Sequence, residues 1–169
     1  LLSTILSAKG YVLYRHCLPE YKMRELFTET EISAPPEYVW RILVHFNKFP
    51  EWNPFIKKAE GQIAEGGRLK VRIEPPGGTG MTFKPIVKRV VLNRELRWLG
   101  RLMVPGLFDG AHSFEILPTG DASVRFIQRE SFRGLLVPLF WKSLMGPTKQ
   151  GCQDMNTALK QRAEKSFDD

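Results

Sequence analysis

Hydrophobic and polar residues alternate along most of this chain, a pattern typical of strands with one buried face. The alternation appears first in residues 26–33 and returns after residue 66, in segments separated by turns rich in glycine and proline. These later segments are residues 69–73, 81–87, 96–100, 112–116 and 124–132, with a bulge expected at Pro85. Since no helical pattern interrupts them, they predict an antiparallel meander.

Helical periodicity replaces the alternation in two places. Between residues 39 and 46, apolar residues recur at i, i+4 and i+7, and the prolines of residues 47–55 then prevent a long regular element. Two short helices are therefore expected after the first strand. Gly146 and Pro147 mark the expected start of a long C-terminal helix, in which residues 152–159 carry an apolar stripe.

Together these elements predict an α+β fold, with a curved antiparallel sheet wrapped around a long C-terminal helix. We expect one domain over residues 26–169, preceded by an appendage at residues 1–25. In this appendage the apolar residues precede the basic ones, which is the reverse of the order in a signal peptide.

The amino-acid composition indicates the class of protein and its expected location. The chain has 169 residues, of which 43% are hydrophobic and 25% charged, the balance of a globular domain. Its uncharged stretches are too short to cross a membrane. Only Cys17 and Cys152 are present, so we expect a reducing, cytoplasmic location. The net charge of +7 is spread along the chain, which favours a role in solubility over a nucleic-acid partner.

A bent sheet under a single helix tends to leave a gap, and the residues facing it mix aromatic rings with a few polar groups. Those we expect to contact a ligand are Trp52, Asn53, Phe55, Phe83, Trp98, His112, Phe114, Phe126, Gln128, Glu130, Phe132, Met155 and Leu159. The alternative is that the apolar residues only pack the core. The polar residues would then form an internal network that satisfies their buried hydrogen-bonding atoms.

His112 and Glu130 are the candidate catalytic residues, because an imidazole beside a carboxylate in an apolar pocket can relay protons. If Ile116 lies opposite Val124, His112 faces Gln128 and the Glu130 side chain is a diagonal neighbour. No histidine and cysteine spacing fits a metal site, and the glycines at 77–80 lack the helix start of a phosphate cradle. We therefore expect neither a metal nor a cofactor.

Several sequence motifs resemble one known superfamily. They are residues 34–40 (APPEYVW), 49–55 (FPEWNPF), 95–100 (ELRWLG), 108–114 (FDGAHSF) and 129–134 (RESFRG). They are similar to the polyketide cyclase/dehydrase-like branch of the helix-grip superfamily, also called SRPBCC, which includes START domains and pollen-allergen proteins. One departure is His45, where this branch more often has an acidic residue. The resemblance implies the helix-grip fold, whereas the superfamily's functions range from carriers to cyclases and hydrolases.

Three functions stay open on the sequence. The favoured one is binding of a hydrophobic or amphipathic small molecule, such as a lipid, polyketide or isoprenoid, in a cavity between sheet and helix. The second is a cofactor-independent cyclase, dehydratase or hydrolase that uses His112 and Glu130 as an acid–base pair. The third is an interaction module whose basic surface binds RNA, a membrane or a protein. The sequence identifies neither the ligand nor the oligomeric state.

Overall fold

The computed structural model describes residues 23–101 and 104–168. The strands are β1 (Arg24–Ile32), β2 (Ile56–Gly61), β3 (Leu69–Ile73), β4 (Met81–Phe83), β5 (Ile86–Val91), β6 (Glu95–Arg101), β7 (Asp109–Gly120) and β8 (Ser123–Arg133). The helices are α1 (Pro36–Val44), α2 (Phe49–Trp52) and α3 (Val137–Asp168), with a 3-10 turn at Phe46–Lys48. None of the helices in these residues combines the length and apolar character of a membrane span.

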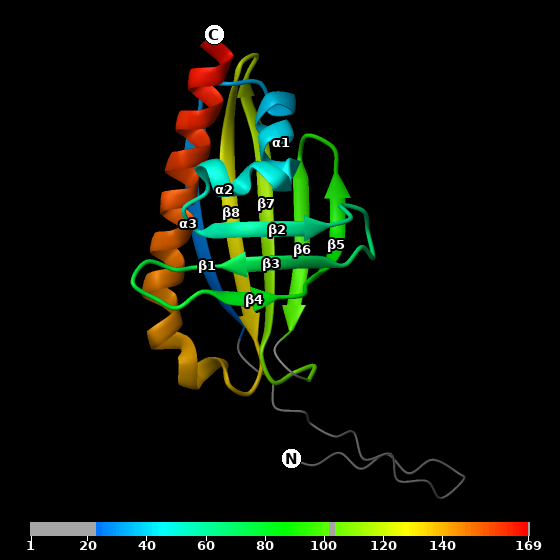
Figure 1. Ribbon diagram of the computed structural model, residues 1–169, viewed down its shortest axis with the longest axis vertical. Helices are drawn as coiled ribbons and strands as arrows, with labels where there is room; N and C mark the ends of the chain where they lie inside the picture. Colours follow the sequence, from blue (N-terminus) through cyan, green and yellow to red (C-terminus); the bar gives the residue numbers. More distant parts are fainter. Residues whose placement is uncertain (1–22, 102–103, 169) are drawn as a thin grey trace, which may run out of the picture.

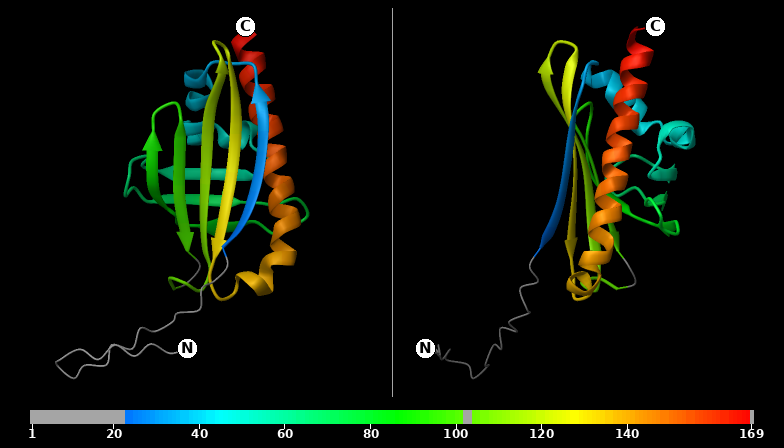
Figure 2. Two further views of the ribbon diagram at one scale, coloured as in Figure 1. Left: turned by 180° about the vertical axis from the view of Figure 1, so that it is seen from behind. Right: turned by 90° about the vertical axis from the view of Figure 1, so that its left-hand side faces the viewer.

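The strands form two antiparallel sheets that enclose an interior together with α3. The five-stranded sheet has the order β1-β8-β7-β6-β5, and the three-stranded sheet has the order β2-β3-β4. A bridge between Arg68 and Ile86 links the two. In Figure 1 the strands of the smaller sheet run crosswise to those of the larger one, and Figure 2 shows α3 along one side of the space between them. This is the α+β helix-grip fold expected from the sequence.

The boundary predicted between the appendage and the domain, at residue 25, falls inside β1. This strand begins at Arg24, so it includes the last two residues of the expected appendage. Residues 1–22, with Cys17, lie outside the described residues. Cys152 is buried with a free thiol in α3.

The sequence predicted one antiparallel meander, whereas the strands form two sheets. Strand β2 was not predicted, because a bulge between Ile56 and Lys58 breaks its alternation of buried and exposed residues. Residues 81–87, expected as one bulged strand, are instead two strands in different sheets. Pro85 separates β4 from β5 and accepts a backbone hydrogen bond from Leu69, so the chain passes here from one sheet to the other.

The register expected for the last hairpin was wrong by two residues. Ile116 lies opposite Phe126, and His112 lies directly opposite Glu130. The strands continue to Gly120 and Ser123, with an irregularity between Pro118 and Gly120 that the sequence pattern does not reveal. The observed register places the imidazole and the carboxyl side by side on the inner face.

The long helix begins earlier than the sequence indicated. Helix α3 starts at Val137, and Pro147 lies inside it. A proline at this position cannot donate to the carbonyl of Ser143, which ordinarily bends a helix. Further along, α3 approaches the start of β2 closely at Gly151, where an added Cβ would lie 2.2 Å from Phe55 Cδ2. Only glycine allows this approach.

Candidate functional site

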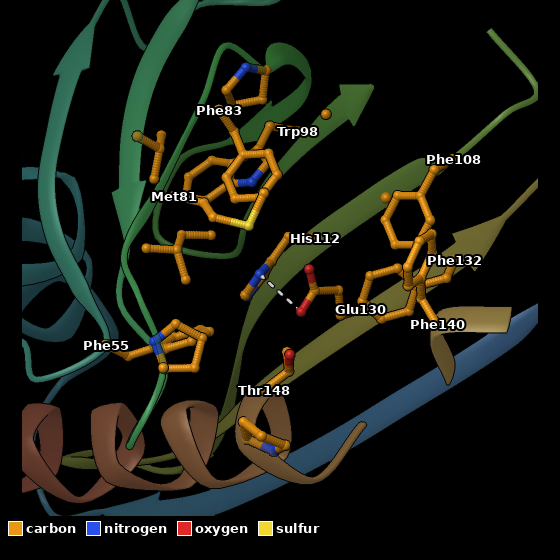
Figure 3. Close-up of a pocket in the computed structure, with 18 of the residues that line it drawn as sticks. Phe55, Met81, Phe83, Trp98, Phe108, His112, Glu130, Phe132, Phe140 and Thr148 are labelled. Atoms are coloured by element: carbon orange, nitrogen blue, oxygen red, sulfur yellow. Dashed lines mark ion pairs between the residues drawn. The ribbon is translucent and has the colours of Figure 1, made fainter. Parts of the chain in front are cut away.

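A cavity of about 430 Å³ lies between the two sheets and the N-terminal half of α3. Its wall is formed by Phe55, Val71, Ile73, Pro75, Gly78, Thr79, Met81, Phe83, Pro85, Trp98, Gly100, Phe108, Gly110, His112, Glu130, Phe132, Phe140, Ser143, Pro147 and Thr148. Figure 3 shows aromatic side chains on both sides, with His112 and Glu130 between them. The volume is within the usual range for small-molecule sites, and the wall has their predominantly apolar composition.

The exposed lining residues show where the cavity opens. Gly78, Thr79 and Met81 are exposed on the β3–β4 segment, while Phe140 and Ser143 are exposed on α3. The deeper residues, among them Trp98 and His112, are buried. The mouth therefore lies between the β3–β4 segment and the first turns of α3.

Opposed glycines create part of this space. Gly100 on β6 pairs with Gly110 on β7, and both line the cavity. A Cβ at Gly110 would meet only the Phe132 ring, at 3.6 Å, and a Cβ at Gly100 would meet nothing closer than 3.7 Å. Larger residues would fit the strand backbone here but would project into the cavity. Glycine at both positions keeps the room open for a ligand.

The orientation of His112 is set by a buried network behind it. The Gln128 side-chain nitrogen donates to the Cys152 carbonyl at 3.1 Å and to Asn156 Oδ1 at 2.6 Å. Asn156 in turn donates to Thr28 Oγ1 at 3.2 Å. Because both Gln128 donors are engaged, its Oε1 faces His112 Nε2, at 3.0 Å, and can only accept. Neutral His112 thus carries its proton on Nε2 and presents the lone pair of Nδ1 to Glu130.

His112 and Glu130 are two uncharged groups over a broad pH range. Burial lowers the pKa of His112 to about 4, against the opposing effect of the hydrogen bond that its Nε2 donates to Gln128. Burial also raises the pKa of Glu130 to about 7. Between these values Glu130 is a carboxylic acid and His112 a neutral base. Environments that push two pKa values apart in this way assign an acid and a base.

The facing atoms of this pair have no hydrogen-bond partner within the described residues. His112 Nδ1 and Glu130 Oε2 are buried and unpaired, and 3.9 Å separates them. That distance is too long for a direct hydrogen bond. A ligand hydroxyl could lie within about 3 Å of both atoms, donating its proton to Nδ1 and accepting from the protonated Glu130 carboxyl. The pair is therefore a polar contact point on an otherwise mostly apolar wall.

A pH titration of stability tests the state of Glu130. Its raised pKa means that its contribution to stability is complete below pH 4.5, its ordinary value, and is lost as the pH rises through about 7. The His112 contribution has the opposite sign, being complete above pH 6.5 and lost as the pH falls through about 4. Relative to that of wild type, the free energy of unfolding of Glu130→Gln should rise by about 3 kcal/mol between pH 4 and pH 8. Denaturant unfolding at several pH values measures this, and parallel curves would contradict the assignment.

The structure brings six of the predicted ligand-binding residues to the cavity. These are Phe55, Phe83, Trp98, His112, Glu130 and Phe132. The other predicted residues are not part of its wall: Trp52, Asn53, Phe114, Phe126, Gln128, Met155 and Leu159.

Packing explains where those other residues lie. Phe114, Phe126, Met155 and Leu159 are fully buried in the core, and Trp52 packs against it. Asn53 uses its Oδ1 to accept from the backbone nitrogens of residues 55 and 56, which fixes the turn into β2. Gln128 supports His112 from behind. Alternation assigns a side chain to the inner face, but it cannot tell where along that face the core ends and the cavity begins.

Sequence reasoning missed the residues of the mouth and the paired glycines. Gly100 and Gly110 could have been found, since they are two positions away from Trp98 and His112 on the same strand faces. Phe140 and Ser143 were hidden because the helix was expected to begin at residue 146. Met81 was expected only as a strand residue.

Comparison with protein families adds an independent finding. Residues 23–164 match a family described as "Polyketide cyclase / dehydrase and lipid transport". The chain belongs to this family. The match covers every strand and most of α3, so it extends over nearly all the described residues. A comparison with curated proteins finds no significant match.

Solved structures show the same fold. The ZhuI aromatase/cyclase from Streptomyces sp. R1128 superimposes with a TM-score of 0.72 at 13% identity, over 86% of this chain and 96% of that one. A START superfamily protein from Mycobacterium smegmatis gives 0.65 at 23% identity, over 84% and 98%. A norcoclaurine synthase mutant from Thalictrum flavum, in complex with a transition-state analogue, gives 0.67 at 16% identity, over 87% and 98%. At these identities the likeness concerns the fold alone.

Proposed function

We propose that this protein binds a hydrophobic or amphipathic small molecule, of the size of a lipid, polyketide or isoprenoid fragment, between the two sheets and α3. The single observation that supports this most strongly is an open cavity of about 430 Å³ with a predominantly apolar wall. Burying about 300 Å² of apolar ligand surface would contribute about 7 kcal/mol before the entropy loss of association.

The polar pair gives the ligand a preferred orientation. A ligand with one hydroxyl group would place it against His112 Nδ1 and Glu130 Oε2, the buried unpaired atoms of the wall, with the hydroxyl donating to Nδ1. The apolar remainder would then extend past Trp98 and Phe132 toward the mouth. An entirely apolar ligand would leave both polar atoms unsatisfied, which is unfavourable in a buried site. Amphipathic ligands are therefore favoured.

Native mass spectrometry tests the proposal. The purified chain, examined directly and after incubation with the uncharged probe N-phenylnaphthylamine, should carry one small molecule per chain. Competition between the probe and any copurifying compound would show that both use one site. A chain that carries nothing and takes up no probe would overturn the proposal.

Acid–base catalysis is the second candidate, and the unpaired His112 Nδ1 and Glu130 Oε2 favour it. In the dehydration of a β-hydroxy ketone, Nδ1 would take the proton from the carbon beside the carbonyl, and Glu130 would protonate the departing hydroxyl. A C–H and a C–O bond break, a C=C bond forms and water leaves. The proton then passes from His112 back to Glu130, and no cofactor is consumed.

Product analysis separates the two functions. Incubation with a β-hydroxy ketone of suitable size should return an unsaturated ketone if the pair is catalytic. In that case Glu130→Gln should slow turnover by about a hundredfold or more, with ligand uptake retained. Recovery of the unchanged ketone, bound but not converted, would contradict catalysis on this substrate class and leave the binding function in place.

A further inference from the structure

Exposed large hydrophobic side chains gather beside the cavity at one end of the molecule. Val104, Leu135, Leu139 and Phe140 are all exposed, and we refer to these four residues as the apolar rim. Leu135 and Leu136 donate backbone hydrogen bonds to Gly106 and Leu107, which holds the β6–β7 connection against the chain entering α3. Figure 1 shows both segments together at the lower end of the molecule.

The apolar rim adjoins the mouth of the cavity. Phe140 belongs to both, because it lines the cavity and is 40% exposed. Met81, which is 48% exposed, lies on the β3–β4 segment that forms the other side of the mouth. Exposed apolar side chains clustered beside an opening commonly mark an interaction site, whereas scattered ones do not. A ligand leaving the cavity would pass directly over the rim.

The charges around the apolar rim have mainly one sign. Residues 101–110 and 133–150 contain Arg101, Arg133, Lys142 and Lys149 but a single acidic residue, Asp109. Asp109 forms an ion pair with Arg101. The exposed cations have long aliphatic stems, which can lie along an apolar surface while the charged ends reach anionic groups. This end of the molecule is therefore both apolar and basic.

We propose that the apolar rim docks on the surface of an anionic phospholipid bilayer, with the cavity mouth facing the membrane. Leu135 and Leu139 enter the headgroup and acyl boundary, and the flanking arginines and lysines contact anionic headgroups. The occupant is a membrane because apolar side chains at the tip and cations around them match the layered chemistry of a bilayer surface. The cavity then exchanges an amphipathic ligand with the bilayer without exposing it to water.

Vesicle flotation with the full chain tests this surface. Wild type should float with vesicles of phosphatidylcholine and phosphatidylserine, bind phosphatidylcholine vesicles more weakly, and dissociate as salt is raised. Leu139→Glu should weaken binding to the anionic vesicles about tenfold or more. The matched control is Leu92→Glu, since Leu92 is 72% exposed and Leu139 is 73% exposed, but Leu92 lies at the β5–β6 turn. The control should bind as wild type does.

Three results would overturn the docking proposal. In the first, wild type binds neither kind of vesicle. In the second, Leu139→Glu and Leu92→Glu bind the anionic vesicles equally well. In the third, wild type binds no vesicles but forms a dimer in light scattering, and Leu139→Glu dissociates that dimer. The last would assign the rim to a second copy of the chain. Leu139 does not line the cavity, so Leu139→Glu should still take up N-phenylnaphthylamine. Probe uptake therefore tests ligand binding and vesicle flotation tests docking, so either proposal can be contradicted without the other.

Discussion

Replacing Gly110 with leucine should weaken the uptake of N-phenylnaphthylamine about a hundredfold, or about 2.7 kcal/mol, while the protein stays folded. The new side chain would start beside the Phe132 ring and project into the cavity, where no backbone atom blocks it. Strand residues other than glycine are well tolerated by an extended backbone, so the loss should come from occupied space. Fluorescence titration of the probe measures the dissociation constant.

Ala111→Leu is the matched control for this experiment. Ala111 is the next residue on β7, and its side chain points to the opposite face of the sheet. It should bind the probe as wild type does, although the same leucine has been introduced one position away. If both variants bind like wild type, the probe does not occupy the space beside Gly110.

Phe114→Ala should lower the free energy of unfolding by about 3–5 kcal/mol, because the substitution leaves a cavity in a close-packed region. Phe114 is fully buried. Its ring centroid lies 4.3 Å from that of His112, 5.0 Å from that of Trp98 and 6.1 Å from that of Phe126. The melting temperature should fall by roughly 10 °C. Denaturant and thermal unfolding give the two values.

Phe83→Ala is the comparison that separates core from cavity wall. Phe83 lines the cavity and is only half-buried, so its loss should lower the free energy of unfolding by about 1 kcal/mol while weakening probe binding. Phe114 was expected from the sequence to contact the ligand, but it lies outside the wall. Equal destabilisation by the two substitutions would contradict the boundary drawn here between core and cavity.

The sequence predicted what depends on local periodicity. Alternation placed Trp98, His112 and Phe132 on one face because side chains of a strand change sides at each residue. It also indicated the α+β class, since the change from strand to helical periodicity is visible within a few residues. The motif resemblance pointed to the same family that the later comparison with family models identified.

Features that depend on distant parts of the chain were not predicted. The His112–Glu130 pairing follows from a hairpin with an irregularity between Pro118 and Gly120, and its register differs by two residues from the one expected from the turn. The mouth depends on where α3 begins, and Pro147 concealed that start because prolines are more often found at helix ends than inside helices. The tautomer of His112 depends on Asn156, which is far away in sequence but close in the fold.

A crystal structure of the wild-type chain incubated with N-phenylnaphthylamine tests the central claim most directly. We expect probe density inside the cavity, in contact with Trp98 and Phe132, with the probe amine near His112 and Glu130. Probe density confined to the outer surface, above an interior that side chains fill completely, would contradict it.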